Sequence, residues 1–188
     1  MTHFHKIKTI VVFFCLFMLF ADISVAAEAR LTNFIVTNTR DELLIYLNVE
    51  DAFTDKIVEA ILSGVPTTFS FYISLSERRN YWVDDKIKEL KVSHTIKYNN
   101  LKKEFIISRS WESKPIVTQD IEEAKKLMTE IDSLKVISLD KLTKGTRYQI
   151  SAKAELSRFT LPLYLHYVLF FVSLWDFETD WYTIDFIY

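Results

Sequence analysis

Two stretches of the chain alternate apolar and polar residues with a period of two, and this alternation limits the possible fold more than any other feature. In TTFSFYISLS (67–76) and RYQISAKAEL (147–156), every second side chain is apolar. This period is typical of β-strands that turn one face to a core and the other to solvent. An amphipathic helix would need apolar residues three and four positions apart. Both stretches therefore predict half-buried strands.

Two hairpins are predicted beside these strands. LTNFIVTN (31–38) and ELLIYLNV (42–49) are joined by only three residues, TRD. LKVSHTIKY (90–98) is followed by Asn99 and Asn100, which tolerate a tight turn before KEFIISR returns. Strands joined by such short connections run antiparallel.

Two helices interrupt the predicted strands. The first covers residues 51–63 and ends at Gly64, and the second covers residues 118–131 with Thr118 as its N-cap. With only 2 glycines and 3 prolines, the chain has no low-complexity linker at which to divide it. The predicted fold is mainly β with two short helices, a single antiparallel β-sandwich-like domain of about seven or eight strands over residues 28–188.

The N-terminus has the features of a signal peptide. Lys6 and Lys8 precede an apolar run over residues 10–21, and small residues follow up to Ala27. As a helix, this run would rise about 18 Å, against about 30 Å of bilayer hydrocarbon, so an uncleaved anchor is disfavoured. We predict cleavage after Ala27. The sole cysteine, Cys15, would then be lost, and no Asn-x-Ser/Thr site is present. These features indicate a bacterial periplasmic or otherwise extracytoplasmic protein.

A run of 17 residues near the C-terminus, 159–175, contains no charged side chain. A helix of this length spans about 25 Å, and Pro162 and His166 would lie inside it. The tail that follows is acidic and has no lysine or arginine, which contradicts the positive-inside rule for a span. The run also alternates, so we expect a buried strand or a short buried helix. A membrane-dipping segment or an apolar docking surface remains an alternative.

Few residues offer catalytic or metal chemistry. Only His94 and His166 remain after cleavage, and no HExxH spacing occurs. His94 is expected to be a hydrogen-bonded core residue. Two isolated glycines cannot form a phosphate-binding loop, so no cofactor is predicted. Asp176, Glu178 and Asp180 alternate and are weak candidates for Ca²⁺, but the EF-hand glycine is missing.

Several lysines lie on the predicted strand 90–98 and in the turn that follows it. The formal net charge of −2 provides no field that would attract nucleic acid. A local patch could still meet anionic lipid or an acidic partner, although a solvated strand face is the simpler interpretation. The candidate binding residues are Lys91, Lys97, Lys102 and Lys103.

Three segments together resemble a known family. YNNLKKEFII, LPLYLHYVLFF and WDFETDWYTIDF are similar to the bacterial domain-of-unknown-function family 4390. The resemblance implies an exported protein and supplies no reaction. In some members a neighbouring gene encodes a membrane sensor kinase, which implies a possible sensor partner. The residues that carry the resemblance are Tyr98, Leu101, Phe105, Pro162, Trp175, Phe177, Thr179 and Trp181.

Three functional hypotheses follow from the sequence. The first is a non-enzymatic interaction or accessory module that contacts another envelope or membrane protein. The second is a carrier of a lipid or other apolar ligand in a cavity of the sandwich. The third is a hydrolase-type enzyme that uses His166 with Asp176 or Glu178. The oligomeric state is left open.

Overall fold

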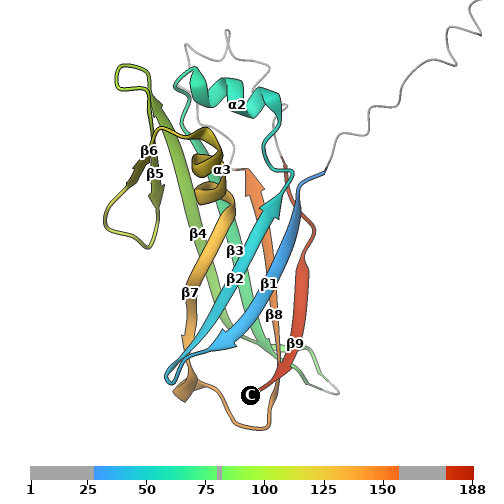
Figure 1. Cartoon of the computed structure of the whole chain (residues 1–188). Coiled ribbons are helices and arrows are strands. Elements are labelled where there is room, and N and C mark those ends of the chain that lie inside the picture. The colour runs from blue at the N-terminus through green and yellow to red at the C-terminus, as the bar shows by residue number, and fades with distance from the viewer. Residues whose placement is uncertain (1–27, 80–81, 157–176) are drawn as a thin grey trace, which may run out of the picture.

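The computed structural model describes residues 28–79, 82–156 and 177–188. The predicted leader and the uncharged run 159–175 lie outside the described residues. Within them, the chain forms nine strands and two α-helices, and the strands make two antiparallel sheets that face each other (Figure 1). The predicted class, a mainly β single domain with two helices and a sandwich-like arrangement, is confirmed.

The smaller sheet has three strands in the order β1-β2-β7. The hairpin predicted at the start of the domain forms its first two strands, with a bulge where Asn33 takes a φ of 51°. The third strand pairs with β2 far from it in sequence. The bounds are β1 Arg30–Asn38, β2 Glu42–Glu50 and β7 Glu130–Ser138.

The larger sheet has six strands in the order β6-β5-β4-β3-β8-β9. The two most strongly alternating segments, β3 and β8, pair with each other at its centre. The predicted second hairpin forms β4 and β5, and β4 is longer than expected. The bounds are β3 Thr67–Glu77, β4 Asp85–Asn99, β5 Glu104–Arg109, β6 Ile116–Thr118, β8 Arg147–Leu156 and β9 Tyr182–Ile187.

Both helices are shorter than predicted. Helix α2 covers Asp55–Leu62 because the Thr54 side chain caps it, accepting from the Ile57 N–H at 3.4 Å. Helix α3 covers Ile121–Thr129, since Asp120 caps it rather than Thr118. Thr118 instead ends β6, and the extended backbone at Glu130 opens β7. A single 3₁₀ turn, η1, covers Leu139–Lys141.

Three of the four edge strands, β6, β7 and β9, were not predicted. In β7 the alternation is interrupted by bulges, and Ser133 has a φ of 55°. Bulges insert an extra residue and shift the period, which hides a strand from a search for alternation. Strand β6 has only three residues. Strand β9 follows Asp176, Glu178 and Asp180, the weak candidates for Ca²⁺.

The core lies between the sheets, and the helices cover the side of the larger sheet that carries β4 and β5 (Figure 1). On β3, the inward side chains Phe69, Phe71, Ile73 and Leu75 are buried. Burying such a side chain contributes about 1.5–3 kcal/mol. The alternation seen in the sequence therefore corresponds to the inner and outer faces of the sheet.

Substitutions at two adjacent positions of β3 test this assignment. Ile73→Ala removes a buried side chain, and we expect it to lower the free energy of unfolding by about 2–5 kcal/mol. Ser74→Ala on the outer face should change it by less than about 0.5 kcal/mol. Urea denaturation measures both. Similar losses at the two positions would contradict the assignment.

Candidate functional site

The chain leaves β8 and returns toward β9 at one end of the sandwich. The backbone N–H of Leu156 donates to the carbonyl of Phe177 at 2.9 Å. The ring of Phe177 packs edge-on against Phe69, with 5.0 Å between centroids. Leu156 and Phe177, the described residues on either side of the segment 157–176 that carries the uncharged run, therefore lie side by side.

Thr179 anchors the returning chain. It is 3% exposed, and its hydroxyl accepts from the Ala154 N–H at 3.0 Å. Its own N–H donates to the carbonyl of Ala154 at 2.9 Å. This hydrogen bond stabilises the junction, because losing it would leave a buried polar group without a partner. The family-like residues Phe177 and Thr179 thus have a structural role.

A cluster of charged and aromatic side chains lies on the outer face of the larger sheet. The hydroxyl of Tyr72 donates to the carboxylate of Glu155 at 2.5 Å. The ammonium groups of Lys91 and Lys153 lie 4.8 and 5.3 Å from the centre of the Tyr72 ring. Such distances are typical of cation–π contacts. Lys91, a predicted binding residue, is therefore held by a tyrosine.

Lys153 links this cluster to the C-terminal motif. Its ammonium pairs with Glu178 and lies 5.4 Å from the centre of the Trp181 ring. The Glu178 carboxylate raises the pKa of Lys153 above its ordinary value. Glu178 therefore contacts a cation from its own chain. In the described part of the chain no three His, Cys, Asp or Glu side chains lie close enough together to hold a metal ion.

The hairpin between β4 and β5 presents an apolar tip at the same end of the sandwich. The rings of Tyr98 and Phe105 stack across its base, 4.8 Å apart. The Asn99 side chain accepts from the N–H of Leu101 at 3.1 Å, which fixes the turn. Leu101 is 96% exposed and is followed by Lys102 and Lys103. The tip therefore joins an exposed leucine to two lysines.

The four candidate lysines do not form one patch. Lys91 pairs across the strands with Tyr72, whereas Lys97 lies six residues further along β4, opposite Ile106. Six residues of strand span about 20 Å. Lys102 and Lys103 lie beyond, in the turn. The sequence predicted their exposure, but the length of β4 separates them.

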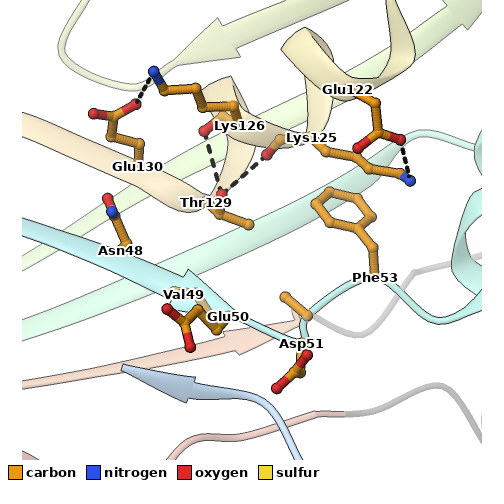
Figure 2. A pocket seen from close by; sticks show the side chains of 11 residues that line it. Asn48, Val49, Glu50, Asp51, Phe53, Glu122, Lys125, Lys126, Thr129 and Glu130 are labelled. Atoms are coloured by element: carbon orange, nitrogen blue, oxygen red, sulfur yellow. Dashed lines mark hydrogen bonds and ion pairs between the residues drawn. The ribbon is translucent and has the colours of Figure 1, made fainter. Parts of the chain in front are cut away.

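A hollow of about 430 Å³ lies between the end of β2 and helix α3 (Figure 2). Its lysines are paired within α3 and with the start of β7: Lys125 contacts Glu122 at 2.7 Å, and Lys126 lies 3.8 Å from Glu130. Glu50, on the opposite wall, pairs with Arg30 at 3.0 Å. Asp51, the remaining carboxylate of the lining, lies 3.9 Å from the same Arg30, so each charged lining residue already contacts an opposite charge of the chain.

A small cavity lies between helix α2 and the larger sheet. It is lined by Phe53, Ile96 and Phe105 among others and has a volume of about 10 Å³. A cavity needs at least about 10–15 Å³ to hold one water molecule, so this cavity is too small for a lipid. The lining expected for a lipid carrier, residues 161–171, lies outside the described residues, and the carrier hypothesis stays a prediction.

His94 lies in the core, as expected, between the rings of Phe71 and Trp111, each 4.9 Å away. Its Nδ1 is 2.8 Å from the carbonyl of Met128. Because a carbonyl only accepts, Nδ1 carries the proton. Nε2 is then a buried acceptor without a partner among the described residues. Burial lowers the pKa of His94 to about 4, and the nearby Arg109 adds to the effect.

Of the other proposed catalytic groups, Glu178 lies within the described residues. His166 and Asp176 lie outside the described residues, as do Pro162 and Trp175 of the family-like motif. Asp180 is exposed. In residues 28–79, 82–156 and 177–188, no helix is long and apolar enough to cross a membrane.

The sequence profile of a domain of unknown function, DUF4390, matches residues 26–185. The chain belongs to the DUF4390 family. No curated protein and no solved structure matches it. The family match includes the smaller sheet, most of the larger sheet and the C-terminal motif as far as Asp185, so the resemblance is confirmed over nearly the entire domain. Family membership provides no activity.

The burial of His94 predicts how stability depends on pH. Its pKa is about 4 in the folded chain and near 6.5 in the unfolded chain, so the folded state favours the neutral ring. This stability is complete above pH 6.5 and is lost as the pH falls toward 4, by about 3 kcal/mol. Denaturation at several pH values would measure it. In a His94→Gln variant, this part of the pH dependence should disappear. An unchanged profile would contradict the assignment.

Proposed function

We propose that this protein is exported, by cleavage after Ala27, to the envelope of a bacterial cell and acts there as a non-enzymatic interaction module. Its partner is another envelope or membrane protein. The surface that contacts the partner is the end of the sandwich from which the uncharged run departs. We name this surface the docking end; in the described structure it comprises Leu62, Leu101, Lys102 and Lys103.

The single observation behind this proposal is the bond between Leu156 and Phe177. It places the two residues that flank the segment 157–176, which carries the uncharged run, at one end of the sandwich. Large exposed apolar surfaces mark binding sites. The flanking residues thus support this end of the molecule as the contact surface.

Other exposed apolar residues gather at the same end. Leu101 and Leu62 stand on neighbouring elements, since a side chain at Gly64 would lie 3.4 Å from the Asn100 amide. Helix α2 and the tip of the β4–β5 hairpin both lie at this end (Figure 1). Apolar and aromatic centres with a charged rim are typical of protein interfaces. Lys102 and Lys103 would supply such a rim.

Export is supported by the position of the first core residue. Ala29, two residues after the expected cleavage position, is buried, and β1 begins at Arg30. A leader removed at Ala27 would therefore leave the domain intact. The absence of a thiol in the mature chain is also compatible with an oxidising compartment.

Site-specific photocrosslinking in the cells that produce the protein tests the proposal. A photoreactive residue at Leu101 or at Leu62 should yield an adduct with one and the same envelope protein, because both positions are exposed and belong to the docking end. Mass spectrometry of the purified adducts identifies that protein.

Trp82 provides a matched control. It is 81% exposed and lies in the β3–β4 loop at the opposite end of the sandwich. A photoreactive residue there should give no adduct with the same protein. Adducts from Trp82 but not from Leu101 would overturn the choice of surface. Adducts from neither end, in cells that contain the folded protein, would overturn the interaction module itself.

A further inference from the structure

The outer edge of β9 is poorly protected against pairing with another strand. Within the described residues, β9 pairs only with β8, so its other edge is open. It forms the margin of the larger sheet (Figure 1). Its sequence YTIDFI contains one charge, and its register with β8 is continuous, without a bulge. An open, regular and apolar edge favours the addition of a strand.

The other sheet edges are protected by features that β9 lacks. Strand β1 has a bulge, and β7 has two bulges together with the charges of Glu130, Asp132 and Lys135. Strand β6 is only three residues long. Short, bulged and charged edges are the usual protection against edge-to-edge pairing. Among the described strands, β9 is therefore the sheet edge with the least protection against pairing with another strand.

The backbone groups that face the open edge can be assigned. The N–H of Tyr188 donates to the carbonyl of Thr146 on the β8 side, at 3.2 Å. Because bonded and non-bonded pairs alternate along an antiparallel ladder, the even-numbered residues of β9 bond to β8. The N–H and carbonyl groups of Thr183 and Asp185 therefore point outward.

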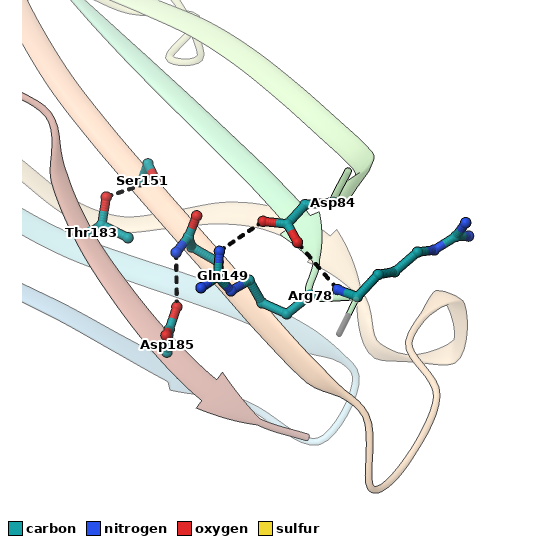
Figure 3. Close-up of polar contacts among 7 residues, drawn as sticks. Arg78, Asp84, Gln149, Ser151, Thr183 and Asp185 are labelled. Atoms are coloured by element: carbon teal, nitrogen blue, oxygen red, sulfur yellow. Dashed lines mark hydrogen bonds and ion pairs between the residues drawn. The ribbon is translucent and has the colours of Figure 1, made fainter. Parts of the chain in front are cut away.

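The side chains of the same two residues are already held in place. The Gln149 amide donates to Asp185 at 3.0 Å, and the hydroxyls of Ser151 and Thr183 are 2.9 Å apart (Figure 3). These contacts fix a hydroxyl and a carboxylate on the outer face of the edge strand, two positions apart. On the inner face, Tyr182 is 48% exposed, and Phe186 is partly exposed.

We propose that β9 pairs with β9 of a second copy of this chain, antiparallel and about a two-fold axis at Ile184. In this register Thr183 of each copy lies opposite Asp185 of the other, and each of these pairs exchanges both backbone hydrogen bonds. A hydroxyl then faces a carboxylate. Tyr182 lies opposite Phe186 on the inner face, which is a favourable cross-strand pair. The two larger sheets become one continuous sheet.

Neighbouring registers are less favourable. Opposite residues must share a face of the sheet, so the axis moves in whole residues. An axis at Asp185 would place the two carboxylates directly opposite each other, which is destabilising. An axis at Thr183 would leave Phe186 without an aromatic partner. The edge is therefore complementary to itself in one register.

Two substitutions at Thr183 with opposite charge test the register. Both replace the Thr183 hydroxyl that contacts Ser151, and they introduce opposite charges at the same position. Thr183→Asp places an acid opposite Asp185 of the second copy, and we expect the dimer dissociation constant to rise about tenfold or more. Thr183→Lys places a base there, and the constant should fall. Sedimentation velocity over a range of concentrations measures the constants, and circular dichroism checks that each variant is folded.

Val117→Asp on β6 is the matched control, because it adds the same charge to an exposed position at the other edge of the sheet. It should leave the dimer unchanged. A wild-type chain that is monomeric at about 100 µM would overturn the proposal. Another segment or another protein would then be the partner of the β9 edge. Equal shifts by the two Thr183 variants, or dissociation by Val117→Asp, would also overturn it. The outcome is independent of the proposed function.

Discussion

The pairing of β3 with both β4 and β8 is the interaction on which the rest of the structure depends. Along β3, each residue from Phe69 to Leu75 has a backbone partner on both sides. Its inward side chains form the centre of the core, and its outward side chains include Tyr72 and the serines. Because a one-residue slip would exchange these two faces, the hydrophobic pattern fixes the register of three strands at once.

The unequal size of the two sheets follows from this central sheet. Three strands cannot cover six, so helix α3 packs over the β4 and β5 side, and the ring of Phe34 on β1 reaches Tyr182 on β9. Coverage is least complete at β9, where three alternate apolar side chains remain partly exposed. The sandwich thus has a filled centre and one open margin, and its contact surfaces lie at the margin and at the docking end.

Several parts of the C-terminal motif act within the domain. Phe177 and Thr179 attach the returning chain to β3 and β8, while Glu178 neutralises Lys153. This arrangement explains an acidic and aromatic motif without a metal or a reaction in the described structure. It also leaves Trp181 half exposed beside the junction.

The sequence by itself determined the class of fold, the central strands, both hairpins, the approximate helices and the core position of His94. These features depend on local spacing, since a period of two or a capping residue acts on its own neighbours. Only the tertiary structure decided that β7 joins β2, that β9 is an edge, that Leu156 meets Phe177, and that the lysines are spread along β4. Bulges concealed β7, and pairing between distant strands has no local signal. Contacts of this kind depend on which faces the core must cover, and that is settled when the two sheets pack together.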